Sequence, residues 1–204
     1  MSETPREPAA PTGGRVGDEV RTRRLAAGLS IAELARRADV SAAFISQLEA
    51  GRSSISIATM YRVAHALSCS ANSLLGASEP RPHVTRAGTG PRLAAGAGEH
   101  SQDPRLLSRT GDDVMLEAYH YVIAPDDDEQ EWFQHEGEDF VYVISGHISI
   151  VFDDGTRVEL STGDSMHHAG TVGHRWLLLG DEAAEVMCIV GSPPATTPAR
   201  PPGN

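Results

Sequence analysis

His135, Asp139 and His174 carry two imidazoles and one carboxylate, side-chain types that bind transition metals. His135 lies four residues before Asp139 in the segment FQHEGEDFVYVISG, and His174 lies eleven residues after Gly163 in GDSMHHAGTVGHRW. Within one strand the first two can converge, and His174 can reach them from a facing strand. Two histidines and one carboxylate match the facial ligand set of non-haem Fe(II), which leaves positions open for water or substrate. Hydrogen-bonded side chains in a pocket without metal explain the same residues equally well.

Residues near this group predict the walls of a small pocket. Glu138 and Asp139 are adjacent in a strand, so only Asp139 would face the interior. His167 and His168 are also adjacent, so at most one of them points inward, and His168 is a reserve ligand. This pocket is expected to be lined by apolar and aromatic side chains, namely Phe133, Val141, Met166 and Trp176.

A second set of residues has the pattern of a DNA-reading helix. Ser30 precedes the periodic segment IAELARRA and is followed three residues later by Glu33, which is a capping box. Ser41 begins the next segment, AAFISQLEAG, and Gly51 is a plausible stop. The short interval from Asp39 to Ser41 has the length of the turn in a helix-turn-helix motif.

Charge is distributed unevenly along the 204 residues, although the net charge of −11 by itself argues against nucleic-acid binding. Residues 15–76 hold eight arginines and five acids, a balance of +3, whereas residues 99–190 hold four arginines and twenty acids, a balance of −16. Such asymmetry predicts two modules with different partners. With 40% hydrophobic residues, the chain can build cores, which excludes a fully disordered or collagen-like protein.

The order of patterns along the chain predicts an α+β protein with two domains and flanking tails. We expect a disordered tail over 1–14, a helical DNA-binding domain over 15–76, a Gly- and Pro-rich linker over 77–104 with one strand near 83–86, an all-β domain over 105–190 and a disordered tail over 191–204. The turn Asp153-Asp154-Gly155 predicts a hairpin. Because Cys69 and Cys188 form no CxxC pair, neither a disulfide framework nor a cysteine zinc site is expected.

The string LSIAELARRADVSAAFISQLEAGRSSISIATMYRVAHAL resembles the helix-turn-helix domain of phage repressors and of a large class of bacterial regulators (XRE-type). The resemblance implies five helices, with the recognition helix at about 41–50. Its first turn would enter the major groove and present Ala42, Ala43, Ser46 and Gln47, of which Gln47 can pair with adenine. Phosphate contacts are expected from four arginines: Arg21, Arg24, Arg36 and Arg52.

The two segments that hold His135 and His174 resemble the paired motifs of the cupin family, a small double-stranded jelly-roll barrel. In metal-binding cupins these motifs supply two histidines and a glutamate, then a third histidine. Here Phe133 stands at the first histidine position, His135 at the second, Asp139 at the acid position and His174 at the last. The resemblance therefore implies one divalent metal (Fe, Zn, Ni or Mn), or none.

The order of helix-turn-helix and cupin resembles a class of bacterial transcription regulators. We expect a sequence-specific regulator rather than an enzyme, with double-stranded operator DNA, a small-molecule effector and a second copy of the chain as partners. A family of mononuclear-iron epoxidases that act on a hydroxyalkyl phosphonate has the same order and is the alternative. The N-terminus lacks a signal peptide and no apolar run is long enough to span a membrane, so a cytoplasmic location is expected.

Overall fold

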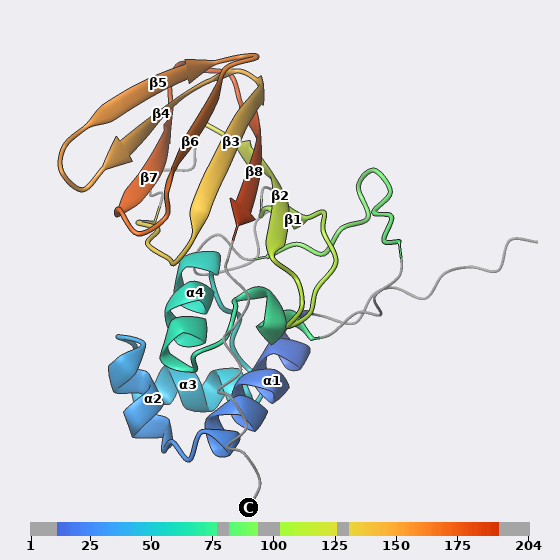
Figure 1. Cartoon of the computed structure of the whole chain (residues 1–204), viewed down its shortest axis with the longest axis vertical. Coiled ribbons are helices and arrows are strands. Elements are labelled where there is room, and N and C mark those ends of the chain that lie inside the picture. Colours follow the sequence, from blue (N-terminus) through green and yellow to red (C-terminus); the bar gives the residue numbers. More distant parts are fainter. Residues whose placement is uncertain (1–11, 77–81, 94–102, 126–130, 192–204) are drawn as a thin grey trace, which may run out of the picture.

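The computed structural model describes residues 12–76, 82–93, 103–125 and 131–191. Helices come first in the chain and strands follow, with the helical part at one end of the molecule and the strands at the other (Figure 1). Within the described residues, no helix is both long and apolar enough to cross a membrane. The α+β prediction is confirmed at this level.

The N-terminal part contains α1 (Thr12–Ala26), α2 (Ile31–Arg37), α3 (Ala42–Glu49) and α4 (Ile57–Ala66). Serines cap the last three helices as local hydrogen bonding predicts: the Ser30, Ser41 and Ser56 hydroxyls each accept from a backbone N–H three residues on. In the turn between α2 and α3, Asp39 has φ 53°, a left-handed conformation that aspartate tolerates better than most residues.

The expected fifth helix is not an α-helix. Its place is taken by the 3₁₀ helix η1 (Asn72–Leu75), which has only four residues. Gly76 ends it with φ 85°, a conformation that stops helix propagation at little steric cost. The first helix also begins earlier than expected, at Thr12, inside the region predicted to be a tail.

The C-terminal part contains two antiparallel sheets. One has the order β1-β2-β8-β3-β6 and the other the order β5-β4-β7. Their strands are β1 (Arg105–Leu106), β2 (Leu116–Ile123), β3 (Glu138–Ser145), β4 (His147–Phe152), β5 (Arg157–Ser161), β6 (Ser165–Ala169), β7 (His174–Leu178) and β8 (Ala184–Gly191). The predicted hairpin joins β4 to β5, with Gly155 at φ 87°. The expected strand near 83–86 does not form.

A shared apolar core lies between the two sheets. Val141 and Val143 of β3 and Ile148 and Ile150 of β4 are all fully buried in it. The burial pattern of β3 alternates strictly, as expected for a strand with one face on the core and one toward solvent. The jelly-roll assignment itself stays a prediction.

Helix α4 packs against the β-sheets, so the two domains share an interface (Figure 1). At its centre the buried carboxylate of Glu117, on β2, accepts hydrogen bonds from the Tyr61 hydroxyl (3.0 Å), the Asn72 backbone N–H (3.0 Å) and the Tyr119 hydroxyl (2.5 Å). Burial raises the pKa of Glu117 above its ordinary value, while these hydrogen bonds oppose the rise. At the edge of the interface, the Ser56 hydroxyl donates to Glu131 (2.7 Å).

Inside the helical domain, Arg24 of α1 and Glu49 of α3 form a two-pronged salt bridge, with N···O distances of 2.6 and 2.8 Å. Both side chains are less than 10% exposed. Arg24 also donates to the Leu29 carbonyl, which closes the turn after α1. The phosphate contact predicted for Arg24 is therefore wrong, because its guanidinium is consumed within the fold.

We expect Arg24→Ala to lower the free energy of unfolding of the helical domain by about 3 kcal/mol, since it leaves the Glu49 carboxylate buried without its partner. Urea unfolding followed by circular dichroism measures the change. Arg36→Ala is the matched control, because Arg36 is exposed and pairs only with Glu33 on the same helix, and it should change stability by less than about 0.5 kcal/mol. Equal stability of the two variants would contradict the role given to Arg24.

Candidate functional site

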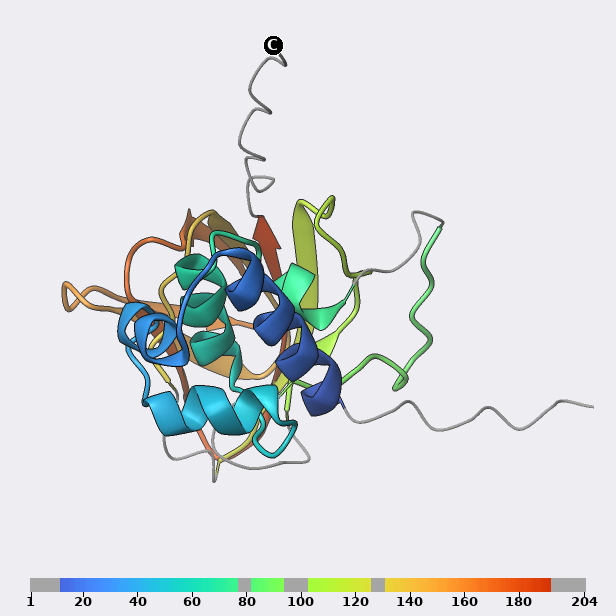
Figure 2. The ribbon, with the colours of Figure 1, turned by 90° about the horizontal axis from the view of Figure 1, so that it is seen from below.

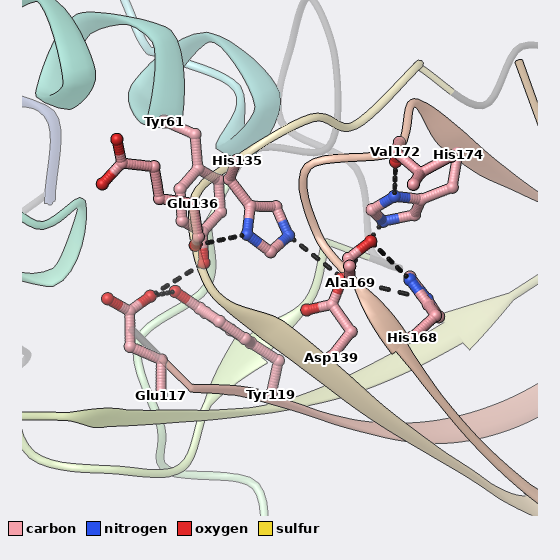
Figure 3. Close-up of polar contacts among 10 residues, drawn as sticks. All are labelled: Tyr61, Glu117, Tyr119, His135, Glu136, Asp139, His168, Ala169, Val172 and His174. Carbon is pink, nitrogen blue, oxygen red and sulfur yellow. Dashed lines mark hydrogen bonds and ion pairs between the residues drawn. The ribbon is translucent and has the colours of Figure 1, made fainter. Parts of the chain in front are cut away.

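The structure brings His135, Asp139 and His174 together, as their spacing predicts (Figure 3). One ligand atom from each lies within 4.8 Å of the others. The Asp139 Oδ2 atom is 3.1 Å from His135 Nε2 and 3.3 Å from His174 Nε2. Asp139 comes from β3 and His174 from β7, so the group bridges the two sheets. All three side chains are at most 5% exposed.

His168 is a third imidazole at this carboxylate. It lies directly opposite Asp139 in the antiparallel pairing of β3 and β6, which places both side chains on one face of the sheet. Its Nε2 atom is 3.9 Å from Asp139 Oδ2, and its ring centre is 4.6 Å from that of His174. His167, which precedes His168 in β6, is exposed to solvent beside Glu138.

Backbone carbonyls orient all three rings. The Nδ1–H of His135 donates to the Glu136 carbonyl, that of His168 to the Ala169 carbonyl and that of His174 to the Val172 carbonyl, at 3.1, 3.2 and 2.9 Å. A carbonyl oxygen can only accept, so Nδ1 carries the proton in each ring. In a neutral ring the Nε2 lone pair then faces Asp139. A hydrogen bond from one ring nitrogen to a backbone carbonyl is a common way in which proteins orient metal-binding histidines.

A cation fits this arrangement. Lone pairs that converge on a carboxylate repel it, and a shared positive ion removes the repulsion. Two buried atoms of the group, Asp139 Oδ1 and His168 Nε2, have no hydrogen-bond partner in the structure. An ion bound at about 2.1 Å by each ligand holds the ligand atoms about 3 to 4 Å apart, and the three distances to Asp139 Oδ2 lie in this range.

The pKa values of His135 and His174 are shifted in opposite directions. Burial lowers the pKa of His135, but the hydrogen bond and the charge of Asp139 outweigh it, so its pKa is raised. Burial dominates at His174, whose pKa is lowered, and the neighbouring imidazoles add to the effect. A neutral His174 keeps its Nε2 lone pair available for coordination.

A cavity of about 20 Å³ adjoins the group. This is enough for an ion or a water molecule but not for a drug-sized ligand. Phe133 and Trp176 line it as predicted, whereas Val141 and Met166 do not: Val141 faces the core between the sheets, and Met166 packs against that core. The remaining walls are residues that the sequence did not single out, namely Ile57, Tyr61, Tyr121, Cys188 and Val190.

Two of these walls come from α4 of the helical domain. The Tyr61 ring stacks on the His135 ring, with centres 4.6 Å apart and planes 24° apart. The same side chain donates its hydroxyl hydrogen to Glu117. Ile57 and Tyr61 are one helical turn apart and therefore share a face of α4. No sequence signal placed this face of α4 beside His135, Asp139 and His174.

The predicted DNA-reading surface lies at the opposite end of the molecule. Helices α1, α2 and α3 lie at the end of the molecule away from the sheets in Figure 1, and α3 lies at the margin of the helical domain in Figure 2. On α3, the side chains of the predicted reading residues are exposed, while Ile45 and Leu48 are buried. The exposed residues are Ala42, Ala43, Ser46 and Gln47, together with the predicted phosphate-binding arginines Arg21, Arg36 and Arg52.

The helical part and the β-sheet part of the chain match two different protein families. Residues 20–74 match the Helix-turn-helix family and residues 119–190 match the Cupin domain family. The chain therefore contains a helix-turn-helix domain and a cupin domain. The resemblances seen in its motifs are therefore confirmed, and the metal-binding candidates all lie in the cupin domain.

Solved structures similar to this chain include an HTH_3 family transcriptional regulator from Vibrio cholerae. It is 19% identical, with a TM-score of 0.64, over 89% of this chain and 97% of that chain. The hydroxypropylphosphonic acid epoxidase from S. wedmorenis is also 19% identical, over 89% of this chain and 100% of that chain, with a TM-score of 0.46. At 19% identity, the likeness to the regulator shows a similar fold and nothing more. The likeness to the epoxidase, with its lower TM-score, supports no conclusion about this chain. No curated protein matches the chain significantly.

We expect the double variant His135→Ala/His174→Ala to lose divalent metal bound by the cupin domain, since it leaves at most Asp139 and one imidazole to hold the ion. Elemental analysis after equilibration with Fe(II), Zn(II), Ni(II) or Mn(II) and desalting measures the metal per chain. His120→Ala/His147→Ala is the control, because both histidines lie away from Asp139 and pair with surface glutamates. Equal metal content in the two double variants would place the binding site elsewhere.

Proposed function

We propose that this chain is a DNA-binding transcription regulator whose cupin domain senses a small ligand through a divalent metal ion. The observation that carries the proposal is the position of Tyr61, which belongs to the DNA-binding domain and forms a wall of the metal-binding group. Occupation of the cupin site therefore acts directly on a helix of the DNA-binding domain. A bound ion supplies a Lewis acid that coordinates an oxygen or nitrogen group of an effector.

The exposed surface of α3 supports DNA binding. Gln47 has the side chain that reads adenine in the major groove, and Ala42 and Ala43 offer apolar contact to thymine methyl groups. Arg21, Arg36 and Arg52 supply positive charge for phosphates, although Arg36 first has to leave its exposed ion pair with Glu33. The strongly acidic β-half repels the duplex, which favours approach by the helical end alone.

One helix connects the two surfaces. Tyr61 of α4 contacts His135, while the next residue, Arg62, donates a hydrogen bond to the Ala38 carbonyl at the end of α2 (3.3 Å). Ala38 leads into the turn before the recognition helix. A shift of α4 caused by ligand binding is thus transmitted to the α2–α3 turn. Because the coupling is a free energy, DNA binding changes the ligand affinity by the same factor.

Operator recognition requires two copies of the domain. Four small or medium side chains on α3 provide few base contacts, so one half-site gives modest specificity. A homodimer that presents two recognition helices about 34 Å apart would double these contacts. We propose such a dimer, with the small-molecule effector and the operator as its other partners.

The iron epoxidase alternative has one observation in its favour, the His135, Asp139 and His174 set, which can hold Fe(II). Its phosphonate substrate needs cationic side chains in the pocket. Among the described residues, no arginine lines the cavity, and the Arg175 guanidinium instead stacks over the Trp132 ring, 4.9 Å from its centre. Oxygen consumption with a hydroxyalkyl phosphonate would establish the enzyme.

We expect Gln47→Ala to weaken binding to a duplex selected from a random pool by about tenfold or more, because a two-pronged contact to adenine contributes ~1–3 kcal/mol of discrimination. Binding to unselected DNA should stay unchanged, since that binding depends on phosphate contacts. Fluorescence anisotropy at fixed salt measures both affinities. An equal loss on both duplexes would remove Gln47 from the base-reading residues.

We expect Tyr61→Leu to uncouple the two domains, because leucine fills space at the interface but neither stacks on His135 nor donates to Glu117. In the native chain, loading with Zn(II) after chelator treatment should change the DNA affinity by at least about fivefold. In Tyr61→Leu the ratio of loaded to metal-free affinity should fall to about one. Tyr121→Phe is the control, because Tyr121 lines the cavity from the cupin side only. A Tyr61→Leu protein that keeps the native ratio would refute the transmission path.

A further inference from the structure

We propose that His168 of β6 is a fourth protein ligand of the metal ion held by His135, Asp139 and His174. This inference deepens the proposed function and rests on its metal site. It gives the chain a ligand set of three imidazoles and one carboxylate, in which the third imidazole comes from a strand that the paired motifs do not use for a ligand.

The position of His168 is dictated by strand pairing. Residues directly opposite in an antiparallel ladder project from the same face, and His168 is paired with Asp139. The side chain is 8% exposed and its Nε2 atom is buried without any hydrogen-bond partner. Burying an imidazole acceptor without a partner costs free energy, and coordination of an ion next to Asp139 removes that cost.

The ring is also held in a ligating orientation. Its Nδ1–H donates to the Ala169 carbonyl, as the equivalent atoms of His135 and His174 do to their own carbonyls. The rings of Phe152 and His174 meet the His168 ring edge-on, with centres 5.2 and 4.6 Å away. Fixed in this way, His168 can turn its Nε2 lone pair only toward the carboxylate.

Phe133 explains why a relocated ligand is needed. Its benzyl side chain cannot coordinate a metal, yet residue 133 forms an isolated antiparallel bridge with His174, through backbone hydrogen bonds of 2.7 and 2.9 Å. The metal group thus lacks a ligand from this side. His168, paired with Asp139 across β3 and β6, supplies a fourth donor without any change to the backbone around residue 133.

A fourth protein ligand changes what the ion can do. Three imidazoles favour Zn(II), Ni(II), Cu(II) or Fe(II) over Mg(II) and Ca(II), which prefer oxygen ligands. A facial set of three protein ligands leaves three positions of an octahedral ion open, whereas four protein ligands leave at most two. This suits an ion that binds one effector group better than an ion that must bind substrate and oxygen together.

The test compares His168→Ala with His167→Ala in the full-length chain, because the two residues are adjacent on β6 and His167 is exposed. Competition with a chromogenic chelator measures the affinities for Co(II) and Zn(II), and visible absorption of the Co(II) protein reports the ligand set. We expect His168→Ala to weaken binding by about 100-fold or more, since even loss of an indirect supporting contact costs ~10–100-fold, and to change the Co(II) bands. The His167→Ala protein should match the native chain in both measurements.

Two results separate failure of this inference from failure of the proposed metal site. Equal affinities and equal Co(II) spectra for His168→Ala and His167→Ala, with tight binding by the native chain, would overturn the role of His168 alone. No binding by the native chain would overturn the metal site together with this inference. His168→Gln serves as a second variant if His168→Ala does not fold, as judged by circular dichroism of the metal-free proteins.

Discussion

The side chain of Tyr61 holds the two domains in one arrangement. Its hydroxyl donates to the buried carboxylate of Glu117 on β2, and its ring covers the imidazole of His135. The first contact satisfies an acceptor that would be costly to leave alone inside the protein. The second closes the metal-binding group on the side of the helical domain. Any change that moves this ring therefore alters both the interface and the cupin site.

The carboxylate of Asp139 imposes a second constraint. Three imidazoles converge on it, each held by a carbonyl that fixes its protonated nitrogen. Such a group is complete only with positive charge at its centre, whether protons or a metal ion. The surrounding aromatic and aliphatic side chains lower the local polarity, which strengthens these interactions. A sensor built in this way responds to what enters a small and rigid space.

Together these constraints relate the two ends of the molecule. Helix α4 contacts both the cupin site, through Tyr61, and the end of α2, through Arg62. It therefore connects the group around Asp139 with the helices that carry the predicted DNA-reading surface. The chain needs no long path between its sites, because one rigid helix spans the distance. The same packing gives the helical domain and the cupin domain a shared interface.

Local chemistry made part of this predictable from the sequence. The helix starts at Ser30, Ser41 and Ser56 depend on hydrogen bonds within one turn, and the alternation of β3 depends on the two-residue period of a strand. The resemblance of two segments to the paired cupin motifs grouped His135, Asp139 and His174, and the structure brings the three together. The expected fifth helix was wrong because the segment before Gly76 is too short for more than a 3₁₀ turn.

The tertiary structure alone decided which groups became partners over long distances. Arg24 was expected at phosphates but pairs with Glu49, 25 residues away, because α1 and α3 pack closely. Whether His167 or His168 points inward depends on the register of β6 against β3, and a shift of one residue would exchange them. The place of Tyr61 depends on how two domains dock. The sequence by itself determined the residue types and local periods, whereas these pairings required the folded chain, because they arise from contacts between segments that no local rule connects.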